Sequence, residues 1–173
     1  MIAISSCGKN SAESQNVEEV TSIHAEYPVY DTAKELIDAS NLVFSGRVKE
    51  IRYESLNTKT ETGPDSSTGL EAASAIPYTI FEIEVDQVYK GEANDEIISI
   101  KRPGGESDGV FYKLDGASEI EILEDYLFIT EAYEKSYPSL LNASQASYKL
   151  SNQSSDEEEN KAIPLSDIME YLD

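Results

Sequence analysis

The clearest pattern in the chain is a strict alternation of apolar and polar residues in two neighbouring stretches. In residues 77–91, Phe81, Ile83 and Val85 alternate with acidic residues, which is typical of a strand with one face on a core. A shorter alternating stretch, 96–102, follows after a polar turn. Together the two stretches predict a long antiparallel hairpin.

Residues 42–55 predict another strand, and this one contains a glycine. Leu42, Phe44 and Val48 share one face and are its best core candidates. Gly46 lies between them, and a glycine inside a strand pattern marks a bulge or a bend at which another strand passes closely.

Shorter strands and two helices complete the expected set. The expected strands are 110–114, 124–130 and 147–150, and the expected helices are 29–41, capped by Asp31, and 163–173. This order lacks the strand–helix–strand rhythm of a parallel sheet. It predicts a mainly β fold, a small antiparallel OB-like barrel of about five or six short strands, with a helix before the first strand and another at the C-terminus.

Several motifs of this pattern together resemble a known family. They are the valine–glycine–valine motif Val43-Phe44-Ser45-Gly46-Arg47-Val48, the turn Lys90-Gly91 and the late strand Tyr126-Leu127-Phe128. They resemble OB-like barrels of the netrin-module and tissue-inhibitor-of-metalloproteinases type, and also a group of uncharacterised Gram-positive surface lipoproteins. The resemblance covers roughly residues 31–150 and implies the barrel fold.

The resemblance does not imply metalloprotease inhibition. Inhibitors of that type present an N-terminal cysteine to the zinc of their target, and their barrels are cross-linked by disulfides. The only cysteine here is Cys7, far ahead of the expected barrel, and one cysteine forms no internal disulfide.

The chain is strongly acidic. It has 13 lysines and arginines against 34 aspartates and glutamates, a formal net charge of −21. Such a chain repels phosphate backbones, so we expect no nucleic-acid partner. Three interpretations of the charge remain open, which are solubility through self-repulsion, binding of hard cations, and binding of a cationic partner. No run of about 18 apolar residues predicts a membrane-spanning helix.

Cys7 explains where the protein is expected to reside. Ile4-Ser5-Ser6-Cys7 resembles a bacterial lipobox, in which small residues precede a cysteine that receives a diacylglycerol. Two acyl chains hold a protein stably on a membrane. A full signal needs a longer apolar segment than residues 1–6 supply, so this interpretation places the start of the signal upstream of Met1. The alternative is a free thiol.

These observations divide the chain into four parts. They are the end of a lipoprotein signal (1–7), a flexible tether (8–27), the barrel domain (28–150) with a long loop at 55–76, and an acidic linker with the C-terminal helix (151–173). The expected location is extracytoplasmic, on the outer surface of a cell membrane.

The sequence contains no recognisable catalytic apparatus. His24 is the only histidine and falls in the expected tether, so a histidine-based nucleophile pair or metal site is not expected. We expect no cofactor and no resident metal. The expected function is a non-catalytic, lipid-anchored binding domain for an envelope protein or glycan. The alternatives are a calcium-dependent surface module or, less favoured, an enzyme of unrecognised type.

Tyrosines and one acidic loop are the candidate binding residues. Tyr53, Tyr78 and Tyr112 are expected to line a groove, because tyrosine suits contacts with sugars and proteins. Glu106 and Asp108, on the glycine-rich segment 103–109, are the candidate ligands for a cation. The same groove interpretation applies to Tyr89, Tyr126 and Tyr133, and the alternative for all six tyrosines is a role in filling the barrel rims.

Overall fold

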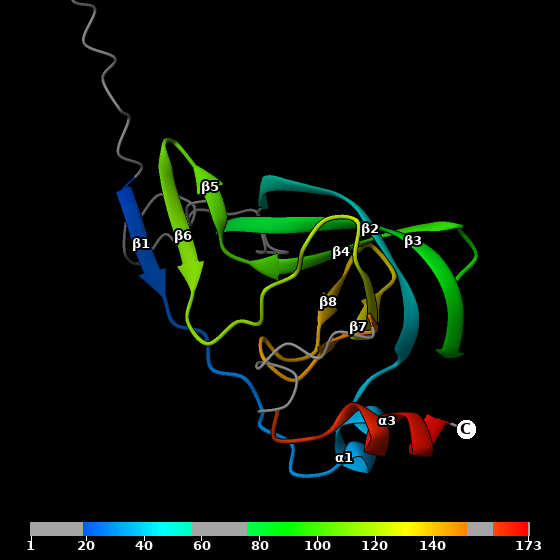
Figure 1. Cartoon of the computed structure of the whole chain (residues 1–173). Coiled ribbons are helices and arrows are strands. Elements are labelled where there is room, and N and C mark those ends of the chain that lie inside the picture. The colour runs from blue at the N-terminus through cyan, green and yellow to red at the C-terminus, as the bar shows by residue number, and fades with distance from the viewer. Residues whose placement is uncertain (1–18, 57–75, 152–160, 173) are drawn as a thin grey trace, which may run out of the picture.

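A computed structural model describes residues 19–56, 76–151 and 161–172 of the chain (Figure 1). The strands in these residues are β1 (Glu19–Ile23), β2 (Leu42–Leu56), β3 (Ile76–Lys90), β4 (Ile97–Pro103), β5 (Gly105–Ser107), β6 (Val110–Leu114), β7 (Asp125–Tyr133), β8 (Ser136–Leu140) and β9 (Ser147–Lys149). The helices are α1 (Ala33–Ala39) and α3 (Leu165–Leu172). None of the described helices is long and apolar enough to cross a bilayer.

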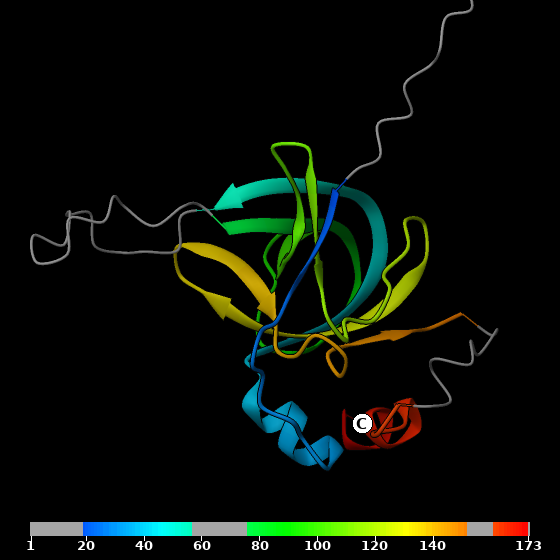
Figure 2. The ribbon, with the colours of Figure 1, turned by 90° about the vertical axis from the view of Figure 1, so that its left-hand side faces the viewer.

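Five strands close into a ring in the order β2-β3-β4-β8-β7 and back to β2, and β9 pairs with β7 outside the ring. Every pairing in the ring is antiparallel except β4 with β8, which meet in parallel at Lys101 and Ser139. The expected OB-like barrel is therefore confirmed. The strands are not all short, however, because β2 and β3 have 15 residues each and curve together around the ring (Figure 2).

Gly46 produces the close approach that bends β2. The register between β2 and β3 shifts between Ser45 and Gly46. A Cβ atom added to Gly46 would lie 2.4 Å from the carbonyl oxygen of Glu84, so no side chain fits there. The bend expected at this glycine is confirmed, and its cause is backbone contact between the two strands.

The Lys90-Gly91 turn joins the barrel to α1. Lys90 Nζ donates hydrogen bonds to the carbonyl oxygens of Ile37 and Ser40, each at 2.6 Å. These carbonyls lie at the C-terminal end of α1, where a cation is favourable. Gly91 has φ 81°, and a Cβ atom there would lie 2.3 Å from the carbonyl oxygen of Asn41. This turn needs glycine for both reasons.

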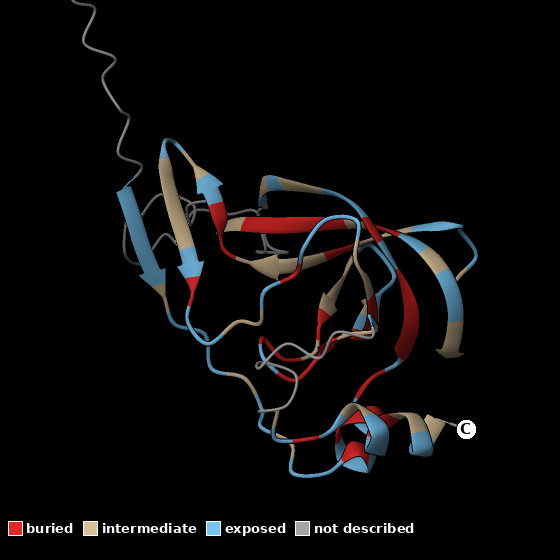
Figure 3. Cartoon of the chain, viewed as in Figure 1, coloured by how far each residue is buried: buried red, intermediate tan, exposed pale blue. Residues whose placement is uncertain are grey.

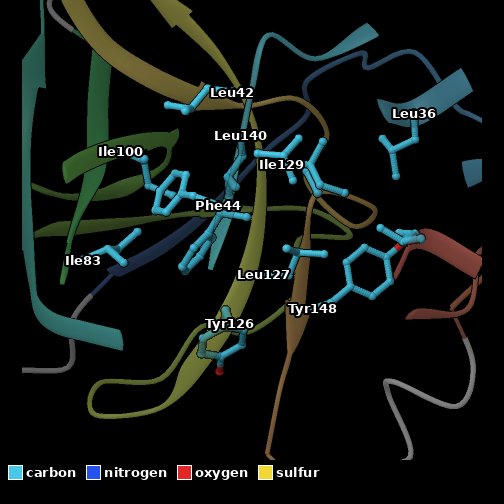
Figure 4. Packing of buried hydrophobic residues seen from close by; sticks show 14 of the residues in the cluster. Leu36, Leu42, Phe44, Ile83, Ile100, Tyr126, Leu127, Ile129, Leu140 and Tyr148 are labelled. Atoms are coloured by element: carbon cyan, nitrogen blue, oxygen red, sulfur yellow. The ribbon is translucent and has the colours of Figure 1, made fainter. Parts of the chain in front are cut away.

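The core has two layers, one on each side of β7 (Figures 3 and 4). Inside the ring, Phe44 and Phe128 pack with ring centroids 5.5 Å apart, next to Ile83 and Ile100. On the other side of β7, Leu127, Ile129 and Tyr148 lie toward the two helices, together with Leu36 of α1. Because both of its faces are covered, β7 is buried from Tyr126 to Thr130. The core candidates of β2 are confirmed, since Leu42, Phe44 and Val48 are all buried.

The start of α1 differs from the expectation by one residue. Thr32, not Asp31, is the N-cap, and its hydroxyl accepts a hydrogen bond from the Glu35 amide at 3.2 Å. The Glu35 carboxylate in turn accepts from the Asp31 amide at 3.1 Å. Asp31 therefore lies one position outside the helix, held by this reciprocal arrangement.

A second, three-stranded sheet covers one end of the barrel, in the order β1-β6-β5 (Figure 1). Its strand β1 corrects the expected tether over 8–27, because Glu19–Ile23 pair in parallel with Val110–Leu114. The glycine-rich segment expected as a loop also contributes a strand, β5, followed by a tight turn at Asp108 and Gly109 with φ 53° and 79°. Cys7, residues 8–18 of that tether and residues 57–75 of the long loop lie outside the described residues.

Candidate functional site

Most positive charges of the described chain are used within the fold. Ion pairs with carboxylates hold Lys34, Arg47, Lys49, Arg52 and Lys149. Backbone carbonyls bind Lys90 and Lys161. In a chain of net charge −21, a carboxylate partner is easy to find, so a partly buried cation without one stands out.

Lys101 is such a cation. Its Nζ atom lies 5.8 Å from the centroid of the Tyr78 ring and 5.2 Å from that of Tyr133, and it donates a hydrogen bond to the Ser136 hydroxyl at 2.5 Å. Among the described residues no carboxylate forms an ion pair with it. Burial lowers the pKa of Lys101 from its ordinary value. We name Tyr78, Lys101 and Tyr133 the tyrosine–lysine cluster.

The cluster lies on the outer face of the barrel. Ile100 and Leu140 belong to the core, so their neighbours Lys101 and Ser139 point to the opposite face. Tyr133 is the last residue of β7 and pairs with Ser136 at the turn into β8. The site is thus formed by the second and third strands of the ring and by the turn between its fourth and fifth. In OB-folds this face and its bordering loops bind oligosaccharides and oligonucleotides.

Both tyrosines of the cluster stay protonated at neutral pH. Burial raises the pKa of Tyr78 and of Tyr133. The Tyr133 hydroxyl donates to the Glu131 carboxylate at 3.0 Å, while 45% of the residue remains exposed. The arrangement therefore offers flat aromatic surface beside one ammonium group. This chemistry suits a ring-shaped ligand that carries an acidic group.

Of the predicted binding residues, only Tyr78 belongs to this cluster. Tyr53 pairs with Thr79 and so lies on the other face of the β2–β3 ladder from Tyr78. Tyr53 packs edge-on against Phe111 of β6, with ring centroids 5.8 Å apart. The predicted groove lined jointly by Tyr53, Tyr78 and Tyr112 is therefore not formed as one surface.

The other predicted residues lie on the three-stranded sheet. Tyr112 of β6 pairs with Gly105 of β5 and with Thr21 of β1. Glu106 is exposed on β5, and Asp108 is exposed in the turn that follows it. In the described ranges, Asp, Glu, His and Cys side chains do not gather in threes around a position that could hold a metal ion.

His24 follows directly after β1 and is 84% exposed in its side chain. Its Nδ1 atom lies 2.9 Å from Asp115 Oδ2, and the Ile23 carbonyl accepts a hydrogen bond from the Asp115 amide. These contacts join the end of β1 to the end of β6. His24 thus helps to hold the end of β1 against the end of β6.

Lys101 is the residue that sequence reasoning missed. Its signal was present in the alternation, because Ile98 and Ile100 face the core and put Lys101 on the opposite face with Tyr78. Tyr133 is among the six tyrosines of the groove interpretation, but its approach to Lys101 depends on the closure of the ring through β8.

Comparison with known proteins does not identify a family, since no family model and no curated protein matches the chain.

Proposed function

We propose that this chain is a non-catalytic binding domain, held at the outer surface of a membrane by a lipid on Cys7, and that its ligand binds over the tyrosine–lysine cluster. The observation that carries the proposal is Lys101, a partly buried ammonium between two tyrosine rings that forms no ion pair with a carboxylate of the described residues. Within the fold this charge is desolvated and poorly compensated. A ligand with an acidic group would supply the missing partner.

The ligand we favour is a mostly neutral glycan that carries one acidic group. The tyrosine rings offer apolar surface to a sugar ring, and Lys101 offers a hydrogen-bonded cation to a carboxylate or phosphate. A polyanion fits less well, because the net charge of −21 repels it over the whole surface. This reasoning also argues against nucleic acid as the ligand.

Matched disaccharides test this proposal directly. Calorimetric titration would compare cellobiouronic acid with cellobiose, and the N-acetylglucosamine–N-acetylmuramic acid disaccharide with chitobiose. We expect the acidic member of a pair to bind about tenfold more tightly, since a charge-assisted hydrogen bond contributes about 1.5 kcal/mol or more. Lys101→Met should abolish the difference, and Tyr133→Ala should weaken both members.

The matched control is Lys113→Met, which removes an exposed lysine from β6 in the other sheet. It should leave binding unchanged. Equal binding of acidic and neutral sugars, or equal loss in the Lys113 and Lys101 variants, would exclude the cluster as the binding site.

The anchor is tested separately in a bacterium that processes lipoproteins. Ser5, Ser6 and Cys7 motivate it, since small residues before a cysteine are what the processing enzymes require. Expressed behind a complete lipoprotein signal, the chain should incorporate radiolabelled palmitate and pellet with membranes. Cys7→Ser should remove both properties. Label that persists in the Cys7→Ser variant would show that the lipid, if any, is attached elsewhere.

A further inference from the structure

A second cation, Arg102, lies on the other face of β4 from Lys101. Its guanidinium carbon is 5.2 Å from the centroid of the Phe81 ring, so the group stacks on the core at one end of the barrel. Nη1 donates a hydrogen bond to the Ser118 carbonyl at 2.7 Å. Nε is buried and has no hydrogen-bond partner. Nη2 has no hydrogen-bond partner among the described residues either.

This arrangement is costly for the folded protein. Burial is the main influence on Arg102 and lowers the pKa of its guanidinium, which shows that the environment disfavours the charge. Of the carboxylates, only Glu119 acts on it noticeably, and it does so through space without forming an ion pair. A buried N–H without an acceptor adds a further penalty. Replacing a poorly compensated buried charge by an apolar side chain of similar size is often neutral or stabilising.

Arg47 shows what the unpaired edge of Arg102 is suited to bind. Nε and Nη2 of Arg47 donate to the two oxygens of the Asp125 carboxylate at 2.9 and 2.6 Å. This is the two-point contact by which arginine recognises carboxylates and phosphates. In Arg102 the same two nitrogens form the edge that lacks acceptors, while Nη1 holds the group in place on Ser118.

Two phenol groups act on the charge of Arg102 through space. Tyr27 and Tyr53 both lie close enough to influence the charge of the guanidinium. Neither hydroxyl has a hydrogen-bond partner in the described part of the chain. Burial raises the pKa of Tyr27, so its hydroxyl keeps the proton that it can donate. Tyr53 is 44% exposed.

We propose that the Nε–Nη2 edge of Arg102 is a binding site for a carboxylate or phosphate group of a small ligand. Nε and Nη2 are both donors, which matches an acceptor-rich anion. The Gly104–Gly105 segment brings the three-stranded sheet over this end of the barrel, because Thr79 Oγ1 donates to the Gly104 carbonyl at 2.9 Å. The proposal does not rest on the tyrosine–lysine cluster.

Thermal unfolding of the full chain in the presence of simple anions is the first test. The probes are malonate and inorganic phosphate at about 50 mM, against sodium chloride of equal ionic strength. We expect at least one probe to raise the Tm by about 3 °C beyond chloride, as saturating binding to the folded state requires. A response to malonate alone identifies a carboxylate ligand, and a response to phosphate alone a phosphate ligand.

Variants decide whether Arg102 is responsible. Arg102→Met should lose the Tm rise while its Tm without anion stays equal or increases, and Arg102→Lys should lose most of the rise because it lacks the two-nitrogen edge. Arg47→Met is the matched control and should keep the full rise. Lys101→Met should keep it as well, which separates this site from the proposed glycan site.

Two results would overturn the proposal. One is the absence of any Tm rise beyond chloride in the unaltered chain, and the other is an unchanged rise in Arg102→Met. If Arg102→Met does not fold, the ¹⁵N–¹H signal of Arg102 Nε in the unaltered chain gives the answer. Anion binding should move that signal while the Arg47 Nε signal stays in place, and an immobile Arg102 signal contradicts the proposal.

Discussion

The two sides of the barrel differ in how completely their polar and charged side chains are paired. On the helix-covered side, formed by β7, β9, α1 and α3, two buried amide side chains are paired, whereas the buried Ser45 hydroxyl has no hydrogen-bond partner among the described residues. Asn142 Nδ2 donates to the Pro28 carbonyl at 2.6 Å, and Gln145 bonds both the amide and the carbonyl of Tyr30 at 3.1 and 2.8 Å. Lys90 Nζ likewise donates hydrogen bonds to the Ile37 and Ser40 carbonyls at the end of α1.

The open side, formed by β3, β4 and the three-stranded sheet, leaves cations incompletely paired. Lys101 lacks a carboxylate within the described chain, and Arg102 has a buried Nε without an acceptor. Since the same chain satisfies comparable groups on the helix-covered side, the difference is not a general property of this fold. Both sites proposed above lie on the second side, where the two cations lack carboxylate partners within the described residues.

The largest contrast should come from truncating one side chain on each side. Leu127 is fully buried on the helix-covered face of β7, so Leu127→Ala should lower the free energy of unfolding by about 3 kcal/mol. Tyr133 is 45% exposed, and Tyr133→Ala should change the free energy of unfolding by less than about 1 kcal/mol. Urea unfolding measures both. Similar losses in the two variants would mean that the open side is part of the stabilising core.

A matched pair of lysines gives the next largest effect. Lys90→Met leaves the Ile37 and Ser40 carbonyls without their ammonium and should cost about 2 kcal/mol of unfolding free energy. Lys101→Met removes a desolvated charge and should stay within about 0.5 kcal/mol of the unaltered chain, or stabilise it. A loss from Lys101→Met as large as that from Lys90→Met would show that Lys101 has a structural role, and it would weaken the proposed glycan site.

Alternation of apolar residues was sufficient to predict the strands that carry the core. It located β2, β3, β4 and β7, and the bend at Gly46, because one-sided burial leaves a period of two in the sequence. It could not locate β1, which is exposed at all but its last residue and is held by backbone pairing with β6 (Figure 3). Main-chain hydrogen bonds leave no pattern in the side chains.

The candidate site was predictable only in part, for a related reason. Tyr78 could be identified because its place in an alternating strand puts it on the outer face. Arg102 could not, since its burial results from the chain folding back at Gly104 and Gly105 to form the three-stranded sheet. Pairings between distant segments therefore decide which charged groups lose their solvent.

The smallest effect concerns Arg47, the paired counterpart of Arg102. Hydrogen bonds from Arg47 lower the pKa of Asp125 below its ordinary value. A lowered pKa in the folded state contributes stability at neutral pH and loses it as pH falls below about 4. Both side chains are about half exposed, at 51% and 43%, so Asp125→Asn should cost no more than about 0.5 kcal/mol at pH 7.

This cost should shrink as the pH falls below about 4 and also in high salt, as measured by urea unfolding of both proteins at each condition. A cost that is independent of pH would mean that the hydrogen-bond geometry, not the charge, stabilises the pair. The expected result would show that an exposed, fully paired arginine contributes almost nothing to this fold. Arg102, by contrast, is partly buried and pairs only through Nη1 with the Ser118 carbonyl, which leaves its Nε–Nη2 edge for the ligand proposed above.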